Sequence, residues 1–547
     1  MSAARRGALA RWGLVALLAW LIGWPLAVTF GAALTSDAGI GAAFGEFARR
    51  GDEWLALGRS LWISAATVGL AAAVGVPLAF LFARADFPGR RVLAELVALP
   101  VALPPLVGVI AFLYLYGESG LATRLVGAAL GSPEPPWRLS GAAAILLVHA
   151  YSMYVYFYLL TRAALARFDG SLLEAASSLG AGAGRRFFRV TLPTLRPALA
   201  AAALLTFLTA LGSFSAPYLF GGSFRVMTTQ ILASKQNGDV DLAEVETVVL
   251  AALAIAGLLA ARRLESAAAP ARQRGVPPAR QRSPRRAVRW ALAAAGWALS
   301  LLLLAPHLTL VVMSFVPRAS WTRELLPPVY SLANWRALGG SLETLRPIAN
   351  SLWMAGVATA GALLLGFAAA RLAARRDRAG RWAELLLGLP WAVPATAFAV
   401  ALATTWSVDR PFAGRLVLVG TALLLPLAYL IRALPSTGRA ALAGLAQLDP
   451  GLEEAARSLG ASKLRTLVRV TLPMLRPALA AGAALAFIAA CGDFVLSIVL
   501  YTFDTRPIAI EILSSLRLQE TGLAAVYGVL LTVLSAAAFL GLARERA

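Results

Sequence analysis

The chain of 547 residues contains little cysteine, histidine or lysine: one Cys, two His and, among its 50 basic residues, only two Lys. The lone cysteine, Cys491, lies in an apolar run and excludes an internal disulfide or a cluster of thiolate metal ligands. His149 and His307 stand apart from the His, Cys or carboxylate spacing that is typical of a metal site. We therefore expect no metal or other cofactor in this chain.

The scarcity of lysine also bears on ATP chemistry. A Walker A loop ends in Gly-Lys, because its lysine reaches the β- and γ-phosphates. Lys235 follows Ser234 and Lys463 follows Ser462, so neither lysine completes such a loop. We expect that the chain is not an enzyme and that any ATP hydrolysis takes place in a partner.

Charged residues are scarce, whereas apolar residues are abundant. Only 14% of the residues are charged and 59% are apolar, and the mean hydropathy is +0.72. This is more apolar surface than a soluble core can bury. The composition predicts an integral membrane protein that contacts the lipid bilayer.

Twelve apolar runs in the sequence are long enough, at roughly 20 residues, to cross the bilayer as α-helices. They lie near residues 12–34, 60–83, 92–117, 139–160, 197–220, 242–261, 290–316, 350–373, 382–408, 413–432, 477–499 and 520–541. The first run exceeds the apolar core of a signal peptide, which favours a retained helix. The prolines in "LPVALPPLVG" from Leu99 and "LPWAVPATAF" from Leu389 are expected to kink their helices. The predicted fold class is all-α, with about twelve transmembrane helices.

The placement of arginine predicts the orientation of these helices, because cytoplasmic loops carry an excess of basic residues. Arg84, Arg90 and Arg91 follow the second run, and five arginines follow the eighth between residues 371 and 381. The segment 262–289 holds nine arginines and one acid, which is typical of a disordered cytoplasmic linker. Both termini are then expected in the cytoplasm. Topology accounts for the net charge of +22, and we expect no binding of nucleic acid.

The two halves of the chain repeat one pattern. "RSLWIS" from Arg59 corresponds to "NSLWMA" from Asn350, and the two proline-containing stretches correspond as well. Residues 168–202 and 448–482 share 22 identities in 35 aligned positions without a gap. Because six helices per half is an even number, we expect two parallel repeats related by an axis along the membrane normal. The expected domains are 1–261 and 290–547, joined by the linker 262–289.

The longest repeated stretch begins with "EAASSLG" at Glu174 and with "EAARSLG" at Glu454. It falls between the fourth and fifth helices of each half, on the arginine-rich side. The alanines favour a short helix, and Gly180 and Gly460 stand where that helix would end. A second short helix is expected to stop at the following Leu-Pro, before the next membrane helix begins. Two short helices, a sharp turn and small side chains predict a surface on which another protein docks.

The spacing of this stretch resembles the EAA signature of permease subunits of binding-protein-dependent ABC importers. That signature reads Glu-Ala-Ala, three residues, Gly, nine residues, an aliphatic residue, one residue and Leu-Pro. The matching residues are Glu174, Ala175, Ala176, Gly180, Val190, Leu192 and Pro193, and then Glu454, Ala455, Ala456, Gly460, Val470, Leu472 and Pro473. The resemblance covers nearly the whole chain, as two fused permease domains with EAA loops at about 163–196 and 433–476.

The resemblance implies a fold like that of type I ABC importer permeases and a location in a bacterial inner membrane. It implies that each EAA loop is a coupling helix that sits in a cleft of a separate ATPase subunit. The implied partners are two copies of a cytoplasmic ABC ATPase and a periplasmic or extracellular solute-binding protein. The chain itself would form the path of the solute.

Two other functional classes agree less well with the sequence. A secondary transporter can also have twelve helices in two parallel halves, but it commonly needs carboxylates inside the membrane as ion relays. Here the acids deep in the apolar runs are nearly confined to Asp493. A membrane scaffold without transport would explain neither the docking loops nor the repeat.

Two further segments bear on the identity of the solute. "GSFSAPYLFGGSFRVMTTQI" from Gly212 and "GDFVLSIVLYTFDTRPIAIEIL" from Gly492 resemble the corresponding segments of fused ferric-iron permeases, with thiamine and polyamine permeases close behind. This resemblance implies ferric iron as the solute, with thiamine or a polyamine as alternatives.

Asp493 aligns with Ser213 in the repeat and is expected deep in an apolar helix. A charge at that depth is costly, so the side chain should face the interior of the bundle or a water-filled cavity. Two roles are open for it. It makes a hydrogen bond in helix packing, with Ser213 as a candidate partner, or Asp493 and Ser213 line the translocation path, where Asp493 offers a negative site to a cationic solute.

Overall fold

A computed structural model describes residues 3–36, 39–102, 104–132, 134–267, 285–317 and 326–544. In these ranges the regular elements are helices, apart from one antiparallel hairpin of β1 (Thr35–Ser36) and β2 (Gly39–Ile40). The expected all-α fold is confirmed. Residues 268–284, which make up most of the predicted linker, lie outside the described ranges, so the linker stays a prediction.

Along the chain, α-helices alternate with short π or 3₁₀ turns, which are marked η. The first half contains α1 (Ala3–Leu18), η1 (Ala19–Gly23), α2 (Trp24–Leu34), α3 (Ala42–Arg49), α4 (Gly51–Arg84), α5 (Arg90–Leu96), η2 (Leu99–Ala102), α6 (Pro105–Tyr116), α7 (Leu121–Leu130), α8 (Gly141–Leu165), α9 (Ser171–Ser178), α10 (Ala183–Arg186), η3 (Phe187–Thr191), α11 (Leu192–Leu211), α12 (Ser215–Phe220), α13 (Met227–Gln236) and α14 (Val240–Ala267). The second half contains α15 (Arg286–Met313), α16 (Ala333–Leu338), α17 (Leu342–Ala373), α18 (Arg378–Ala392), α19 (Ala395–Trp406), η5 (Pro411–Ala413), α20 (Leu424–Gln447), α21 (Pro450–Ser458), α22 (Lys463–Thr466), η6 (Leu467–Thr471), α23 (Leu472–Cys491), α24 (Val495–Leu500), α25 (Ile508–Arg517) and α26 (Thr521–Arg544).

Ten helical stretches in the described ranges are long and apolar enough to cross a membrane. The pair α18–α19, which is bent by 108°, counts as an eleventh. The sequence predicts a twelfth at residues 413–432, but α20 begins only at Leu424 and continues to Gln447. The apolar part of α20 is short because its second half carries polar side chains. Residues 433–447 therefore belong to α20 and precede the second EAA loop.

Proline and glycine interrupt four of the predicted spans. The expected proline kinks are confirmed, because the run near 92–117 divides into α5, η2 and α6, and α18 ends before Pro394. Two further breaks are not predicted by the sequence. The runs near 197–220 and 477–499 divide at residues 212–214 and 492–494, between α11 and α12 and between α23 and α24.

Close helix crossings hold each half together. α4 packs along α8 and α17 packs along α20, while α11 and α23 lie against these respective pairs. A Cβ atom on Gly75 would clash with the carbonyl oxygen of Tyr154, and one on Gly366 would clash with Oγ1 of Thr437. Only glycine permits such an approach of two membrane helices, so both halves use the same kind of crossing.

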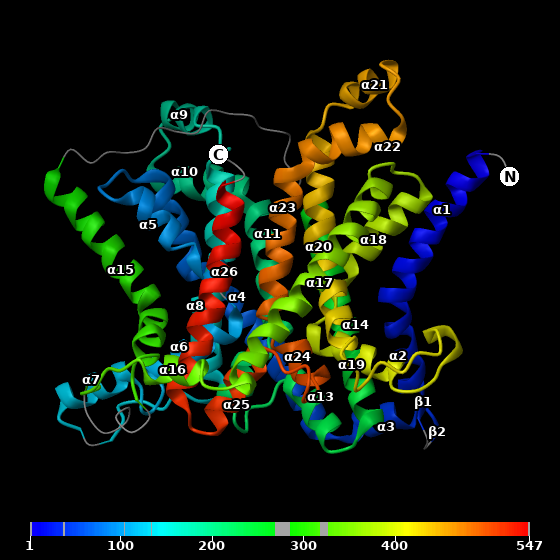
Figure 1. Ribbon diagram of the computed structural model, residues 1–547. Coiled ribbons are helices and arrows are strands. Elements are labelled where there is room, and N and C mark those ends of the chain that lie inside the picture. Colours follow the sequence, from blue (N-terminus) through cyan, green and yellow to red (C-terminus); the bar gives the residue numbers. More distant parts are fainter. Residues whose placement is uncertain are drawn as a thin grey trace.

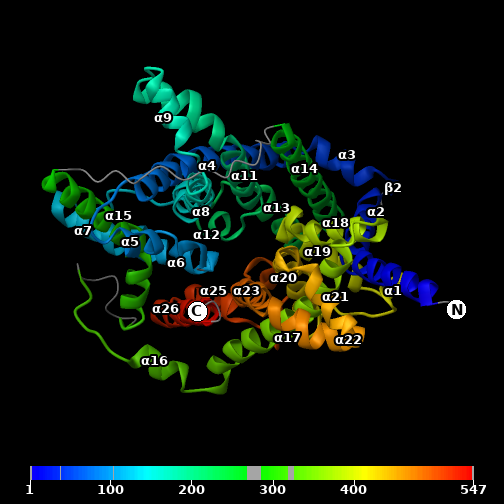
Figure 2. The ribbon, with the colours of Figure 1, turned by 90° about the horizontal axis from the view of Figure 1, so that it is seen from above.

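The halves are interleaved, because each places its first helix against the other half. α1 and α2 pack on α17, α18 and α19, whereas α15 packs on α5 and α6 (Figure 2). At the first of these contacts, Nε1 of Trp20 donates a hydrogen bond of 2.7 Å to the carbonyl oxygen of Phe412. The interleaving buries apolar surface between segments that are hundreds of residues apart.

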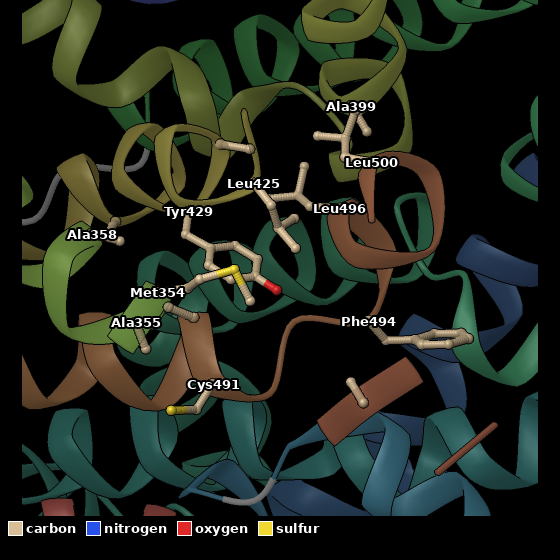
Figure 3. Close-up of a cluster of buried hydrophobic side chains, with 14 of the residues drawn as sticks. Met354, Ala355, Ala358, Ala399, Leu425, Tyr429, Cys491, Phe494, Leu496 and Leu500 are labelled. Carbon is tan, nitrogen blue, oxygen red and sulfur yellow. The ribbon is translucent and has the colours of Figure 1, made fainter. Parts of the chain in front are cut away.

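The two EAA loops project from one end of the bundle (Figure 1). The start of α1 and the end of α26 lie at this same end, whereas α3, α13, α16 and α25 lie at the opposite end. Between the ends, Cys491 is 2% exposed among Met354, Ala355 and Tyr429, and its Sγ donates to the Ser351 carbonyl oxygen at 3.7 Å (Figure 3). Cys491 is therefore a packing residue.

Candidate functional site

The two EAA loops fold in the same way, element by element. α10, η3 and α11 begin at Ala183, Phe187 and Leu192, and α22, η6 and α23 begin 280 residues later in each case. The preceding short helices, α9 and α21, end at the equivalent residues Ser178 and Ser458. The local sequence therefore specifies one structure twice.

Glycine makes the turn between the short helices of each loop. Gly180 and Gly460 have φ angles of +74° and +82°, a conformation that other residues resist. The turn is closed by a hydrogen bond of 3.0 Å from the amide of residue 181 to the carbonyl oxygen of Ala176, and by one of 3.0 Å from residue 461 to Ala456. This is the Schellman arrangement, in which a glycine follows the helix end.

The surfaces of both loops are exposed. No residue of α9 is buried, and Glu174, Ala175, Glu454 and Ala455 are exposed, while Ala176 and Ala456 are half-buried. Beside these residues, Leu179 is 87% exposed and Leu459 is 89% exposed. One large apolar side chain thus projects from each polar loop into the surroundings.

The Leu-Pro pairs of the signature lie apart from this surface. Leu192–Pro193 and Leu472–Pro473 form the first turns of α11 and α23. The sequence predicts that helix stops at these prolines, and this is wrong, since helix is continuous over Ala183–Leu211 and Lys463–Cys491. The π turns η3 and η6 precede each proline, and the wider turn accommodates a residue that cannot donate the usual backbone hydrogen bond.

Side-chain contacts distinguish the two loops. In the second, Glu453 accepts a hydrogen bond of 2.7 Å from Oγ1 of Thr471 and lies 3.1 Å from Arg457 and 3.9 Å from Arg371 on α17. The Thr471 hydrogen bond is the largest cause that lowers the pKa of the Glu453 carboxyl, and the two arginines add to it. We call Glu453, Thr471, Arg371 and Arg457 the clasp.

The first loop has no clasp of this kind. Leu173 occupies the position of Glu453, counted back by 280 residues. The ring of Phe187 instead packs on Phe80 of α4 at a centroid distance of 5.7 Å, and Arg186 donates a hydrogen bond of 2.5 Å to Oγ of Ser177. The two loops therefore share a backbone but are fastened to their halves by different chemistry.

The unexpected helix breaks meet at the centre of the molecule. A Cβ on Gly212 would lie 3.6 Å from Cβ of Pro394, and one on Gly492 would lie 2.6 Å from Cβ of Pro104. Each glycine break thus packs on the proline kink of the other half. The aligned rings of Phe214 and Phe494 lie 5.7 Å apart, beside Tyr218.

Ser213 lies in the first of these breaks and is held by a polar chain. Its hydroxyl lies 2.8 Å from Nε2 of the buried His149, whose Nδ1 lies 3.0 Å from Oγ1 of Thr67 on α4. Thr228 donates a hydrogen bond of 2.7 Å to the Ser213 carbonyl oxygen. Because its ring bridges three segments, His149 is a packing residue that fixes the break.

The sequence predicts that Asp493 lies within a continuous helix. In the structure it lies in the second break instead. The helix is interrupted between Cys491 and Val495, and Oδ1 of Asp493 accepts a hydrogen bond of 2.7 Å from the amide of Leu496 in the first turn of α24. Arg432 of α20 acts on Asp493 electrostatically and donates to the carbonyl oxygens of Pro390 and Val393, the latter at 3.0 Å. Ser213 and Asp493 are thus held by different partners.

A family model described as "Binding-protein-dependent transport system inner membrane component" matches residues 75–270 and again residues 362–544. The chain belongs to this family. It is a permease of a binding-protein-dependent ABC importer, of the fused two-domain type. Each matched region contains one EAA loop and one glycine break.

Several curated permeases are similar to this one. The probable ABC transporter permease protein y4fN of Sinorhizobium fredii is 31% identical over 502 residues, which cover 90% of this chain and 87% of that protein. The ferric transport system permease protein FbpB of Actinobacillus pleuropneumoniae is 28% identical over 450 residues, which cover 81% of this chain and 64% of that protein. The molybdenum transport system permease protein ModB of Mycobacterium bovis is 35% identical over 206 residues, which cover 36% of this chain and 76% of that protein.

Sequence reasoning on this permease missed Glu453. The signature aligns Glu454 with Glu174, whereas the structure gives the adjacent Glu453 the contacts that fasten the loop. The spacing of four residues between Glu453 and Arg457 was the available signal, because such a pair meets on one face of a helix. Within the described part of the permease, no group of three or more His, Cys, Asp or Glu side chains is placed to hold a metal ion.

Proposed function

We propose that this permease docks two copies of a separate ABC ATPase at its EAA loops, and receives solute from a binding protein at the opposite end. The observation that carries the proposal is the pair of exposed loops with the same backbone fold at one end of the bundle (Figure 1). Leu179 and Leu459 would be covered by the ATPase, which removes their large apolar surfaces from water. One loop per half corresponds to one ATPase subunit per half.

The helices that follow the loops suggest how docking is coupled to transport. Helix is continuous from Ala183 to Leu211 and from Lys463 to Cys491, so each loop is joined to a glycine break by one rigid element. A displacement of a loop by the ATPase would move Phe214 or Phe494, whose rings lie against each other at the centre. The solute path would then open and close where the two breaks meet.

The same proposal gives the orientation in a bacterial inner membrane. The ATPase acts on the side where ATP is present, so the EAA loops and both termini would lie in the cytoplasm. The arginines of the adjoining α17–α18 connection support this orientation, since basic loops are retained on that side. Hydrolysis would belong to the ATPase and not to this chain.

Ferric iron is the solute that we propose. The similarity to a ferric transport permease extends over 81% of this chain, whereas the similarity to a molybdenum permease extends over 36%. Thiamine and polyamines are the alternatives from the segments after Gly212 and Gly492. In proteoliposomes that enclose the ATPase and ATP and have the binding protein outside, radioactive ferric iron should accumulate in the lumen. Uptake of labelled thiamine, putrescine or molybdate instead would exclude ferric iron as the solute and leave the docking proposal intact.

Substitution of the turn glycines tests the docking proposal. Gly180→Ala and Gly460→Ala force a side chain into a left-handed conformation, at a cost of roughly 1–2 kcal/mol, although no atom lies within 4 Å of the new Cβ. We expect about 5–30-fold weaker co-purification of the ATPase with normal membrane insertion. Gly184→Ala is the matched control, because Gly184 is in the first loop, equally open and not left-handed. Normal ATPase recruitment by both turn variants would exclude this docking surface.

A further inference from the structure

A pair of glutamates is buried at the end of the bundle opposite the EAA loops. Glu53 lies in the first turn of α4 and Glu246 lies near the start of α14. Both residues are 0% exposed. Figure 1 shows the neighbouring α3 and α13 at this end. Exclusion of two carboxyl groups from water is costly unless their charge is compensated.

Each glutamate has one bonded and one unbonded oxygen. Nε2 of Gln230 donates a hydrogen bond of 2.9 Å to Oε1 of Glu53, and Oγ of Ser234 donates one of 2.7 Å to Oε1 of Glu246. Both donors come from α13. Oε2 of Glu53 and Oε2 of Glu246 are buried and receive no donor, and the two carboxyl groups interact electrostatically with each other. Two carboxylates cannot bond to each other, because neither has a hydrogen to donate.

The surroundings of the pair supply little positive charge. Buried residues of α3, α4 and α14, among them Phe47, Ala56 and Val245, belong to one apolar cluster. The guanidinium of Arg50 attracts Glu246 but is shared with Glu46 at 2.5 Å and Asp239 at 4.0 Å. The pair therefore lies in a medium of low polarity without a cation of its own.

The other titratable groups on the packed elements are directed elsewhere. On α14, Glu244 accepts a hydrogen bond of 3.0 Å from Oγ1 of Thr404 on α19, and Asp241 is half-buried. On α4, Asp52 is exposed, and on α13, Lys235 makes no ion pair with either glutamate among the described residues. None of these groups compensates the pair.

The second half of the permease has uncharged residues at the positions that correspond to the two glutamates. The amide of Met227 donates to Oγ of Ser60 at 2.8 Å, and the amide of Ile508 donates to Oγ of Ser351 at 2.9 Å, so these hydrogen bonds fix the correspondence of the halves. In that register Thr344 and Tyr527 stand where Glu53 and Glu246 stand. Oη of Tyr527 donates a hydrogen bond of 2.6 Å to the carbonyl oxygen of Thr344.

We propose that Glu53 and Glu246 bind a single proton between their Oε2 atoms, and that this proton ties α4 to the α13–α14 hairpin. One carboxyl is then neutral and donates, and the other is ionised and accepts, so both free oxygens are satisfied. The shared hydrogen joins two helices in the first half, as the hydrogen bond from the Tyr527 hydroxyl joins two helices in the second half. Loss of the proton to solvent leaves two like charges facing each other in an apolar shell, and the hairpin that follows the central break loosens.

The pH dependence of stability tests the shared proton. At neutral pH the folded pair holds a proton that the glutamates of the unfolded chain have already released, because their ordinary pKa is about 4.3. The stability that the proton gives is therefore complete below that range and falls as pH rises above it. For the full permease in nanodiscs, we expect the unfolding temperature to fall by about 1–3 °C per pH unit above neutrality. Glu246→Gln replaces the shared proton with a permanent amide donor and should remove this slope. Tyr527→Phe is the control at the matching position and should leave the slope unchanged.

Three outcomes would overturn the proposal. The first is a wild-type slope equal to that of Glu246→Gln. The second is stabilisation by sodium or calcium in wild type and not in Glu53→Gln, which would make the site a metal-cation site. The third is an infrared carbonyl band of a protonated carboxyl that is absent at mildly acidic pH, or that persists unchanged in alkaline buffer. This measurement uses wild type alone, so it applies even if the Gln variants insert poorly.

Discussion

At the scale of the residue, Glu453 and Glu454 show how neighbours in one motif acquire different roles. Glu454 is exposed and carries the signature, whereas the Glu453 side chain is 21% exposed and contacts Thr471, Arg371 and Arg457. Thr471 is the second residue before Pro473, so the clasp fastens α21 to the start of α23. The clasp also reaches α17 through Arg371.

We predict that Glu453→Gln loosens the second EAA loop alone. Gln keeps the size of the side chain but removes the negative charge that attracts Arg371 and Arg457. Because half-exposed ion pairs are worth about 1 kcal/mol or less, we expect cleavage by trypsin after Arg465 to be roughly 2–5-fold faster. Glu454→Gln is the adjacent control and should change nothing. Equal acceleration after Arg186, in the first loop, would contradict a local clasp.

The same contacts predict a pH dependence of the second loop. Since the folded structure lowers the pKa of Glu453, its contribution is complete above the ordinary glutamate range and is lost as pH falls through the lowered value. Amide exchange, corrected for its intrinsic dependence on pH, should report less protection of α21 in acid, and Glu453→Gln should abolish that change. A wild-type loop with constant protection would show that the clasp does not order α21.

At the scale of the element, the sequence predicts what local chemistry determines. The EAA loops could be predicted because alanines, a left-handed glycine and small residues specify their helices and turn within a few positions. The proline kinks could be predicted for the same reason, since proline removes a backbone donor wherever it lies. Proline at residue 193 nevertheless does not end its helix, because a preceding π turn relieves the clash.

The central breaks could not be predicted from the same information. An apolar run that contains Gly212 or Gly492 is compatible with a straight helix, and the break appears only where the proline kink of the other half packs on it. The clasp is likewise non-local, because Arg371 and Glu453 are 82 residues apart. Contacts of this kind depend on the assembled fold and leave no periodic pattern in the chain.

The second break carries a prediction about Asp493. Asp493→Asn keeps an oxygen that can accept from the Leu496 amide, while the negative charge that interacts with Arg432 is lost. If Asp493 lines the path of a cation, uptake of ferric iron should fall about tenfold or more with normal insertion and ATPase recruitment. Ser213→Ala, at the aligned position, keeps all charges and is the control.

A second variant, Asp493→Leu, separates a role of Asp493 in packing from a role in transport. Asp493→Leu removes both the acceptor for the Leu496 amide and the charge, and leaves Arg432 with backbone carbonyls alone, so we expect little folded protein. If Asp493→Asn transports at the wild-type rate while Asp493→Leu is unstable, the residue serves packing only. The path would then be formed by other side chains near Phe214 and Phe494.

At the scale of the whole molecule, the interleaved first helices bind the two halves more firmly than a flat interface would. α1 and α2 lie on α17–α19, and α15 lies on α5 and α6, so each half lacks a covering helix without the other. Arg11 on α1 also pairs with Asp377 at 2.8 Å, and Asp377 caps α18 through the amide of Gly380 at 2.8 Å. Assembly therefore rests on the helices themselves.

This arrangement predicts that the connection between the halves is dispensable. Residues 1–267 and 285–547, expressed as two chains with a tag on the first, should co-purify and transport at a rate within about twofold of the intact chain, because the linker contributes only effective concentration. A version of the first chain that begins at Gly41 lacks α1 and α2, and it should capture far less of the second chain. In intact permease, cleavage within 268–284 should occur from the cytoplasmic face of inside-out vesicles. If the full-length halves separate in mild detergent, the linker holds them together and the contacts of α1, α2 and α15 do not suffice.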